Sequence, residues 1–214
     1  MAIILPSLFG ANILELGEEI KRLEAEETQM LHVDMMDGNF VSNIAFGANQ
    51  IKSLKKSSKM IFDVHMMVAN PLEHIEDVID TGVEMISVHI ESTTHIHLVL
   101  QKIKAAGIKA GVVVNPATPI TNLEYILNDL DYILLMTINP GQAGQTFIEN
   151  SYKKIHDLKE LIGNRDIKIE VDGGIDNVIA KKCKEAGADL IVVGGYLFNG
   201  NLSKNYSKLK EAIG

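Results

Sequence analysis

Short runs of apolar residues, rich in β-branched and aliphatic side chains, recur at similar intervals along the chain. Each run has the length and composition of a buried β-strand. The pattern therefore predicts eight buried strands, at residues 3–5, 30–33, 61–64, 85–88, 109–114, 132–136, 167–171 and 190–193.

Between these runs, apolar residues lie three or four positions apart, which is the spacing of one buried face of an α-helix. The clearest stripes are Ile13, Leu16, Ile20 and Leu23; Tyr152, Ile155, Leu158 and Ile162; and Leu202, Tyr206, Leu209 and Ile213. Helix start signals agree with this spacing. Asn70, Pro71 and Glu73 offer an N-cap, a first-turn proline and a capping-box acid, and Thr118 with Pro119 repeats the first two.

Glycines fall where these helices are expected to end, a few residues before the next apolar run. They are Gly82, Gly107, Gly163 and Gly187. The chain thus repeats a unit of strand, loop, helix and glycine eight times, with about 27 residues in each unit. This repetition predicts an α/β fold, a single (β/α)8 TIM barrel that occupies residues 1–214 as one domain. An open, doubly wound sheet is the alternative, because periodicity alone does not show whether a sheet closes.

Composition limits the possible partners. Of the 214 residues, 46% are hydrophobic and 22% are charged, as in a soluble globular protein, and the ordinary counts of 17 glycines and 5 prolines exclude a disordered or collagen-like chain. The formal net charge of −8 argues against non-specific binding to nucleic acid, because such binding needs an excess of lysine and arginine. It leaves room for one small phosphate in a local pocket.

The chain shows no sign of export or membrane insertion. Its first residues form a short apolar run without a basic leader, and no apolar stretch approaches the ~18 residues of a membrane span. The single cysteine, Cys183, cannot form an internal disulfide and is expected to be a small buried hydrophobe. We therefore expect a cytoplasmic protein in a reducing compartment, with no membrane and no nucleic acid as partners.

Chemically active side chains stand at the ends of three predicted strands. His32 and Asp34 flank Val33 at the end of the second strand, and a spacing of two residues points both side chains to the same side. His65 ends the third strand and Asp172 ends the seventh. Because the chemistry of such barrels gathers at the carboxyl ends of the strands, these four side chains are expected to converge.

Two imidazoles and two carboxylates form a nitrogen and oxygen donor set that suits one divalent metal ion, such as Zn, Fe, Mn or Co. The sequence does not choose among these metals. His89 ends the fourth predicted strand. A solvated or capping role is expected for the histidines in predicted helices, which are His74, His95, His97 and His156.

Three consecutive loops at the same end of the predicted barrel carry glycines. They are residues 139–145 after the sixth strand, 172–174 after the seventh and 194–195 after the eighth. Glycine lets backbone N–H groups approach phosphate oxygens closely, and helix N-termini favour negative charge. Because the loops after strands seven and eight form the usual phosphate site of such barrels, this pattern predicts a phosphate-binding pocket.

Five ordered blocks of sequence carry a family resemblance. They are residues 32–41 (HVDMMDGNFV), 63–67 (DVHMM), 115–119 (NPATP), 135–141 (LMTINPG) and 170–175 (EVDGGI). Together they resemble the ribulose-phosphate 3-epimerase family, and the likeness runs over nearly the whole chain, from residue 5 to residue 198.

This resemblance implies a metal-dependent barrel enzyme of the pentose phosphate pathway. Such an isomerase inverts carbon 3 of a ketose phosphate, interconverting D-ribulose 5-phosphate and D-xylulose 5-phosphate. The resemblance implies that His32, Asp34, His65 and Asp172 hold the metal, and that Asp34 and Asp172 are also the catalytic acid and base. It further implies a homo-oligomer that associates through outer helices and loops.

The resemblance also implies a set of substrate contacts. Ser7 and His65 would contact the substrate, and the pocket would be lined by Met36, Met67 and Met136. The phosphate end would be held by Gly141, Gln142, Ala143, Gly144, Gly173, Gly174, Gly194 and Gly195.

The residue types suit this reaction on chemical grounds. Removing the proton next to a ketone generates an enediolate, whose charge a divalent cation stabilises as a Lewis acid. Inversion then requires reprotonation from the opposite face. Carboxylates from the second and seventh strands, Asp34 and Asp172, can lie on two sides of the substrate. Apolar methionines would keep the intermediate dry.

Departures from the family pattern concern the substrate. Gln142 and Ala143 interrupt the usual run of glycines, and the loop that holds them is expected to close over the substrate. Gly195 replaces the usual serine and is followed by Tyr196, and residues 44–47 are atypical. D-allulose 6-phosphate, a six-carbon relative, is therefore the alternative substrate.

Two other classes fit less well. A noncatalytic sugar-phosphate-binding barrel would require a missing acid, base or ligand, and the sequence lacks none of them. Relatives of orotidine monophosphate decarboxylase have an acidic motif with a lysine at the second and third strands. In this sequence no lysine stands beside His65.

Overall fold

The computed structural model describes residues 2–214, which form nine strands and eight α-helices. The strands are β1 (Ile3–Pro6), β2 (Met30–Asp37), β3 (Ile44–Ala45), β4 (Ile61–Met67), β5 (Met85–His89), β6 (Lys109–Val114), β7 (Tyr132–Met136), β8 (Lys168–Asp172) and β9 (Leu190–Val193). The helices are α1 (Leu16–Ala25), α2 (Ala48–Ser57), α3 (Pro71–Ile79), α4 (Ile96–Ala105), α5 (Ser151–Ile162), α6 (Asn177–Ala186), α7 (Gly195–Phe198) and α8 (Leu202–Ile213).

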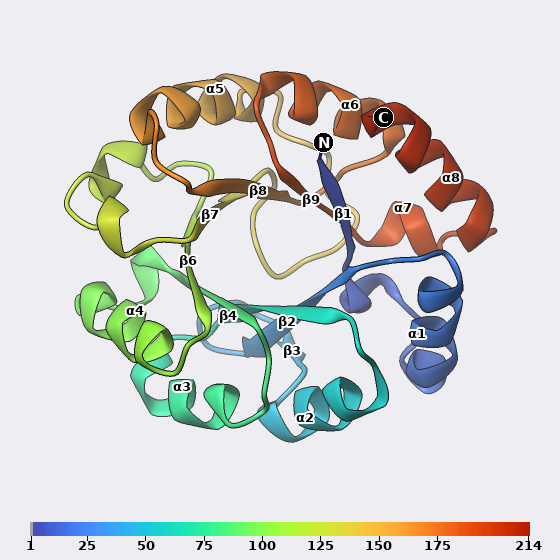
Figure 1. The fold of residues 1–214 in the computed structure, drawn as a ribbon, viewed down its shortest axis with the longest axis horizontal. Helices are drawn as coiled ribbons and strands as arrows, with labels where there is room; N and C mark the ends of the chain where they lie inside the picture. The colour runs from blue at the N-terminus through green and yellow to red at the C-terminus, as the bar shows by residue number, and fades with distance from the viewer. Residues whose placement is uncertain (1) are drawn as a thin grey trace.

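All the strands belong to one curled sheet, in the order β1-β9-β8-β7-β6-β5-β4-β2-β3. Neighbouring strands are parallel except β3, which pairs antiparallel with β2. The sheet curls far enough for β1 and β2 to meet at one parallel bridge, between Ser7 and His32. Figure 1 shows the strands arranged around a ring with the helices outside. The predicted α/β class is confirmed, and the doubly wound alternative is wrong because the strand order follows the chain without reversal.

The helices pack on the sheet through the apolar stripes that the sequence predicts. Helix α5 buries Ile155 and Leu158, and helix α8 buries Tyr206 and Leu209. Cys183 is fully buried on α6, as predicted. The described part of the chain contains no helix long and apolar enough to cross a membrane.

The predicted beginning of the first helix is wrong by one turn. Ile13 lies in a short 3-10 turn, Ile13–Glu15, and 71% of its surface is exposed, whereas α1 begins at Leu16. Because the Ile13 side chain is mostly exposed, it contributes little to packing of the helix on the sheet. The apolar stripe that stabilises α1 starts at Leu16 and continues through Ile20 and Leu23. At the other end of the helices the predicted glycine stops agree with the structure. Gly163 and Gly187 end α5 and α6 with positive φ.

No α-helix follows Thr118 and Pro119; the β6–β7 connection contains only the 3-10 turns Ile120–Leu123 and Leu127–Asp129. A helix N-cap uses its side-chain oxygen and its carbonyl to accept bonds from the first helical turn. Here the Thr118 hydroxyl donates to Glu91 instead, and its carbonyl accepts a bond from Lys154 Nζ at 2.8 Å. The groups of Thr118 that would cap a helix are thus bonded elsewhere, and turns replace the helix expected after the fifth predicted strand.

Two strands extend beyond the predicted boundaries. Strand β2 continues to Asp37, and β4 continues to Met67, so His32, Asp34 and His65 lie inside strands rather than at their ends. The predicted strands end at Val33 and Val64, directly before Asp34 and His65. In the structure the strands continue because their polar side chains find partners inside the ring.

Beneath these polar side chains lies an apolar layer inside the ring, formed by Leu5, Met30, Met85, Tyr132, Leu190 and Val192. Its largest member, Tyr132, packs directly over Gly111 of β6, the residue opposite it in the parallel register. A Cβ atom at Gly111 would overlap the tyrosine ring. The absence of a side chain at Gly111 therefore makes room for Tyr132.

Candidate active site

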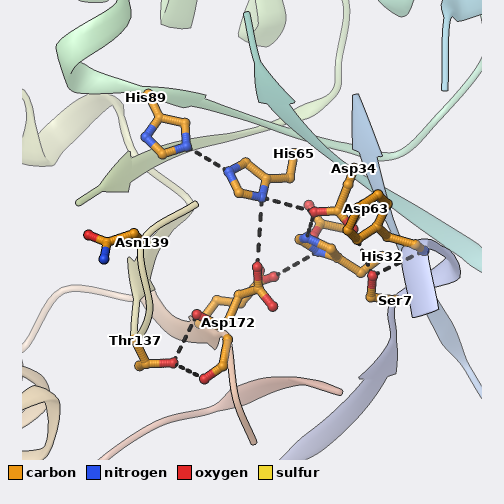
Figure 2. Close-up of polar contacts among 12 residues, drawn as sticks. Ser7, His32, Asp34, Asp63, His65, His89, Thr137, Asn139 and Asp172 are labelled. Atoms are coloured by element: carbon orange, nitrogen blue, oxygen red, sulfur yellow. Dashed lines mark hydrogen bonds and ion pairs between the residues drawn. The ribbon is translucent and has the colours of Figure 1, made fainter. Parts of the chain in front are cut away.

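The register of adjacent strands places four polar side chains in two pairs inside the ring. Asp34 of β2 stands opposite His65 of β4, and His32 stands opposite Asp63. Asp172, at the end of β8, reaches the same place from across the ring (Figure 2).

The four predicted metal ligands come together. Asp34 Oδ1 lies 3.4 Å from His32 Nε2 and 3.4 Å from His65 Nδ1. Asp172 Oδ2 lies 4.0 Å from His65 Nδ1, and one donor atom from each residue falls within 4.8 Å of all the others. The second carboxylate oxygen of Asp34 accepts a hydrogen bond from the Ser7 hydroxyl at 2.7 Å, which fixes the orientation of the carboxylate.

The unpaired nitrogens of this cluster fit a metal ion. His32 Nε2 and His65 Nδ1 are buried without a hydrogen-bond partner, and each lies 3.4 Å from the same oxygen of Asp34. A buried polar atom left unpaired costs about 1–3 kcal/mol. A cation bound among the four residues would satisfy both nitrogens with donors that divalent metals prefer. The cluster is therefore compatible with a metal site.

A buried carboxylate behind His32 orients its ring. Asp63 Oδ2 lies 2.6 Å from His32 Nδ1, and the Tyr132 hydroxyl donates to Asp63 Oδ1 at 2.6 Å. A histidine that donates its other N–H to a carboxylate has a fixed tautomer and a more basic ligand nitrogen. Asp63 therefore leaves Nε2 of His32, the atom on the Asp34 side, free to offer its lone pair to a cation bound in the cluster.

Burial and mutual charge set the protonation of the cluster. Burial lowers the pKa of His32, but the nearby charge of Asp34 and the bond to Asp63 raise that pKa well above its ordinary value. Burial raises the pKa of Asp34, but His32 and His65 lower it below its ordinary value. Burial raises the pKa of Asp172 to about 7, with His32 opposing the rise and Asp34 adding to it. The two carboxylates thus differ widely in pKa, which is the usual arrangement of an acid and base pair.

Four buried polar side chains near the cluster were not among the predicted site residues. Asp63, Glu170, Ser87 and His89 each lie two positions from another polar residue on the same strand, and all four are fully buried. The spacing of two residues pairs Asp63 with His65 and Glu170 with Asp172, just as it pairs His32 with Asp34. Applied to every strand, that rule would have found them.

A cavity of about 270 Å³ opens beside the cluster. Asp34 and Asp172 line it. The predicted substrate-binding residues in its wall are Ser7, Met36, Met67, Met136, Gly141, Gln142, Ala143, Gly144, Gly173, Gly174, Gly194 and Gly195. His65 is the exception, because its side chain is fully buried and faces the cluster rather than the cavity.

The loop after β7 lies against the loop after β2, at one side of this cavity. Asn43 donates to the carbonyl of Gly141 at 2.6 Å, and Gln142 donates to the hydroxyl of Ser42 at 3.3 Å. Gly141 has a φ of 87°, and a Cβ atom there would lie 2.5 Å from the Cβ of Val41. This close approach requires glycine at position 141.

The opposite side of the cavity is formed by the glycines after β8 and β9. Gly173 has a φ of 120°, and a Cβ there would overlap Ile138, so the backbone can pass close to the cavity only as glycine. Thr137 fixes this turn by donating to the carbonyl of Gly173 at 2.5 Å. Gly194 lies at the N-terminal end of α7, and Tyr196 closes the region by donating to Asn177 at 2.8 Å.

A curled parallel sheet with paired carboxylates and a buried His/Asp cluster at its inner edge defines a TIM-barrel-like α/β enzyme. The profile of the "Ribulose-phosphate 3 epimerase family" matches residues 3–198. The chain belongs to this family.

Its relatives support the assignment over almost the full length. The chain is 41% identical over 217 residues to ribulose-phosphate 3-epimerase of Aquifex aeolicus, covering all of this chain and 97% of the relative. It is 40% identical over 198 residues to the Bacillus subtilis enzyme of the same name, covering 91% of each chain. The chloroplastic ribulose-5-phosphate-3-epimerase of Arabidopsis thaliana is 40% identical over 215 residues, covering 99% of this chain and 75% of the relative.

Solved structures with low sequence identity share the fold. The tryptophan synthase α-subunit of Pyrococcus furiosus superposes with a TM-score of 0.71 at 16% identity, covering 98% of this chain and 97% of that one. Orotidine 5'-phosphate decarboxylase of Pyrococcus horikoshii superposes with a TM-score of 0.69 at 17% identity, covering 99% of both. At these identities the likeness shows the fold alone.

Proposed function

We propose that this chain is a metal-dependent ribulose-phosphate 3-epimerase that interconverts D-ribulose 5-phosphate and D-xylulose 5-phosphate. The observation that carries the proposal is the placement of Asp34 and Asp172, with widely different pKa values, on strands at separate positions of the ring and in the wall of one cavity. Relatives that bear this name at about 40% identity support the choice of substrate.

We further propose that the curled sheet is a closed (β/α)8 barrel and that residues 1–214 act as one catalytic domain. The bridge between Ser7 and His32 supports closure, since it joins β1 to β2 beside the cluster. The matched family region covers almost all the strands and helices, which supports a single unit.

His32, Asp34, His65 and Asp172 would hold one divalent ion, Zn, Fe, Mn or Co. When bound, the ion supplies a Lewis-acid charge that stabilises negative charge developing on the substrate oxygens. Four carboxyl groups, those of Asp34, Asp63, Glu170 and Asp172, lie in or beside this cluster, and their number supports the binding of a cation. The raised pKa values of His32 and Asp172 show that the cluster attracts protons, and a cation would replace them.

Asp34 and Asp172 would act as the base and the acid. One carboxylate takes the proton from carbon 3 on one face of the substrate, and the other carboxylic acid returns a proton to the opposite face, which inverts the centre. Ser7 holds the Asp34 carboxylate in place through its 2.7 Å hydrogen bond. In the reverse direction the two residues exchange roles.

The rest of the cavity would bind and shield the substrate. Met36, Met67 and Met136 offer apolar walls that exclude water while the carbanion character develops. The glycines after β7, β8 and β9 would meet the phosphate through backbone N–H groups. Closure of the Gln142 loop would complete the shield.

The decisive experiment is the substitution Asp172→Asn. Because an amide cannot transfer the proton, we expect turnover of ribulose 5-phosphate to fall by at least ~100-fold, the usual contribution of a positioned acid or base. The control is Asp166→Asn, which removes an exposed carboxylate before the same strand. Full activity in the Asp172 variant, with its circular dichroism unchanged, would rule out the two-base scheme.

A kinetic comparison of substrates tests the sugar. We expect kcat/KM for ribulose 5-phosphate to exceed that for allulose 6-phosphate, because the 270 Å³ cavity is small and the family relatives carry the pentose name. The reverse order would assign the six-carbon substrate. Binding of either sugar phosphate without turnover would favour a noncatalytic binder.

A further inference from the structure

His89, at the end of β5, lies directly behind His65 and outside the four-residue cluster (Figure 2). Nε2 of His65 and Nε2 of His89 are 2.8 Å apart, and the two rings stack with their centroids separated by 4.9 Å. Phe40 packs on the ring of His89 at a centroid distance of 4.6 Å. Both histidines are fully buried, so their contact lies inside the fold.

A carboxylate on the far side of His89 continues this contact. Glu91 lies two residues beyond His89, and its Oε2 is 3.3 Å from His89 Nδ1. Its other oxygen accepts a bond from the backbone N–H of Asn115 at 2.9 Å and another from the Thr118 hydroxyl. Burial raises the pKa of Glu91, but the bonds from His89, Thr118 and Asn115 lower it to about 2. Glu91 is therefore an ionised carboxylate at neutral pH.

The turn that anchors Glu91 is itself held in place. Lys154 of α5 donates to the carbonyls of Asn115 at 2.7 Å, Pro116 at 3.2 Å and Thr118 at 2.8 Å. These bonds replace the missing helix after β6 with a rigid turn. Glu91 is thus fixed from behind by backbone and side-chain donors rather than by solvent.

With both imidazoles neutral, the hydrogen bonds from Glu91 through His89 to His65 allow only one arrangement of protons. An ionised carboxylate can only accept, so Nδ1 of His89 carries a hydrogen toward Glu91. With its single hydrogen on Nδ1, the neutral imidazole of His89 has a lone pair on Nε2, which accepts from Nε2 of His65. His65 then has no hydrogen on Nδ1, the atom that lies 3.4 Å from Asp34.

We propose that Glu91 and His89 are positioning residues that set the tautomer of His65, so that its Nδ1 offers a lone pair to a divalent cation in the cluster. This inference rests on the metal site proposed above. It assigns a purpose to His89, which contacts the cluster only through His65, and to Glu91, which contacts His89; neither residue lines the cavity. It also gives His65 the same kind of support that Asp63 gives His32.

The test is the isosteric substitution Glu91→Gln. The amide oxygen would accept from Asn115 and Thr118, so its NH2 group would face His89 and reverse the direction of both hydrogen bonds. Nδ1 of His65 would then carry a hydrogen. We expect the affinity for Co²⁺, measured by visible absorption during titration of the metal-free protein, to fall by about 10- to 100-fold.

The matched control is Glu84→Gln, at the other end of β5. Glu84 is also a partly exposed carboxylate that accepts a backbone N–H, that of Phe62 at 2.9 Å, and it has no contact with either histidine. We expect its Co²⁺ affinity to equal that of the wild type. Equal affinity in the wild type and in Glu91→Gln would overturn the proposal.

Long-range ¹H–¹⁵N correlation spectra of the metal-free wild type read the tautomers directly, without any variant. We expect the Nε2–H form for His65 and the Nδ1–H form for His89; the Nδ1–H form at His65 would overturn the proposal even if the variant misfolds. A wild type that shows these tautomers but binds no Co²⁺ would instead contradict the proposed metal site.

Discussion

At the scale of single residues, Glu170 is a fully buried acid inside the ring. Both of its carboxylate oxygens are buried without a hydrogen-bond partner, and one lies 3.3 Å from His32 Nδ1. Burial and the charge of Asp63 raise the pKa of Glu170 well above its ordinary value. The folded protein therefore holds a proton on Glu170 at pH values where the unfolded chain has released it.

This pKa shift predicts that the free energy of unfolding falls as pH rises, and that Glu170→Gln removes this fall. Because the folded pKa lies above 4.5, the stabilising effect of protonation is full below pH 4.5 and is lost as pH rises through the folded pKa. The loss is at most ~1.4 kcal/mol per pH unit over that window. We expect urea unfolding of the metal-free variant to depend less on pH between 5 and 8, and its stability at pH 8 to match or exceed the wild type.

Glu160→Gln, which changes an exposed carboxylate on α5, is the control for this measurement. A Glu170 variant that loses more stability at pH 8 than at pH 5 would show that the carboxylate, not the acid, is the folded form.

At the scale of elements, the loop between β7 and α5 depends on two glycines with the same backbone strain and different surroundings. Gly141 and Gly144 have φ values of 87° and 79°. A Cβ atom at Gly141 would lie 2.5 Å from Val41, whereas a Cβ atom at Gly144 would meet nothing within 4 Å. The pair therefore separates the effect of backbone strain from that of contact with the β2 loop.

We expect Gly141→Ala to raise KM about tenfold more than Gly144→Ala. Both variants carry the cost of positive φ, about 1–3 kcal/mol, but only the first also pushes the loop away from Val41. Steady-state kinetics with ribulose 5-phosphate measures the difference. Equal KM values in the two variants would mean that the loop leaves Val41 when substrate binds.

The elements differ in how far the sequence predicts them. All eight parallel strands were predictable because each is a long enough buried run. The α5 and α8 stripes agree with the structure except at Tyr152 and Leu202, which are only half-buried against the core. Strand β3 was not predicted, since it has only two residues and 83% of Ile44 is exposed. The β6–β7 connection was not predicted either. Its cap residue, Thr118, bonds to groups distant in sequence, which local patterns do not register.

The site, like the fold, is predictable where local patterns determine it and not where it depends on contacts distant in sequence. The sequence places the four cluster residues on strands, and the fold brings them together, because one face of a parallel strand is predictable from alternation. The hydrogen bonds from Glu91 through His89 to His65 depend on which strands are neighbours and on the register between them. Those relations appear only in the folded chain.

At the scale of the whole molecule, a bound metal would join distant parts of the ring. The proposed ligands come from β2, β4 and β8, so unfolding would have to release the ion. A ligand at 100 times its Kd adds about 2.7 kcal/mol to the free energy of unfolding, and for a chain of this size each kcal/mol raises Tm by roughly 2–4 °C.

We therefore expect saturating Co²⁺ or Zn²⁺ to raise Tm by roughly 5–11 °C over the EDTA-treated protein, measured by scanning calorimetry. The variant Asp172→Asn should show a smaller rise, because it lacks one ligand. An unchanged Tm in the wild type, at a metal concentration that supports activity, would argue against a site inside the ring.

The geometry of the four-residue cluster also depends on Gly111, which matters for protein design. Its bare Cα admits the ring of Tyr132, whose hydroxyl holds Asp63, which in turn orients His32. Anyone who grafts the four ligands onto another scaffold must also transplant this glycine from a strand that contributes no ligand. The portable unit of the site is thus larger than its coordinating atoms, and one of its parts has no side chain at all.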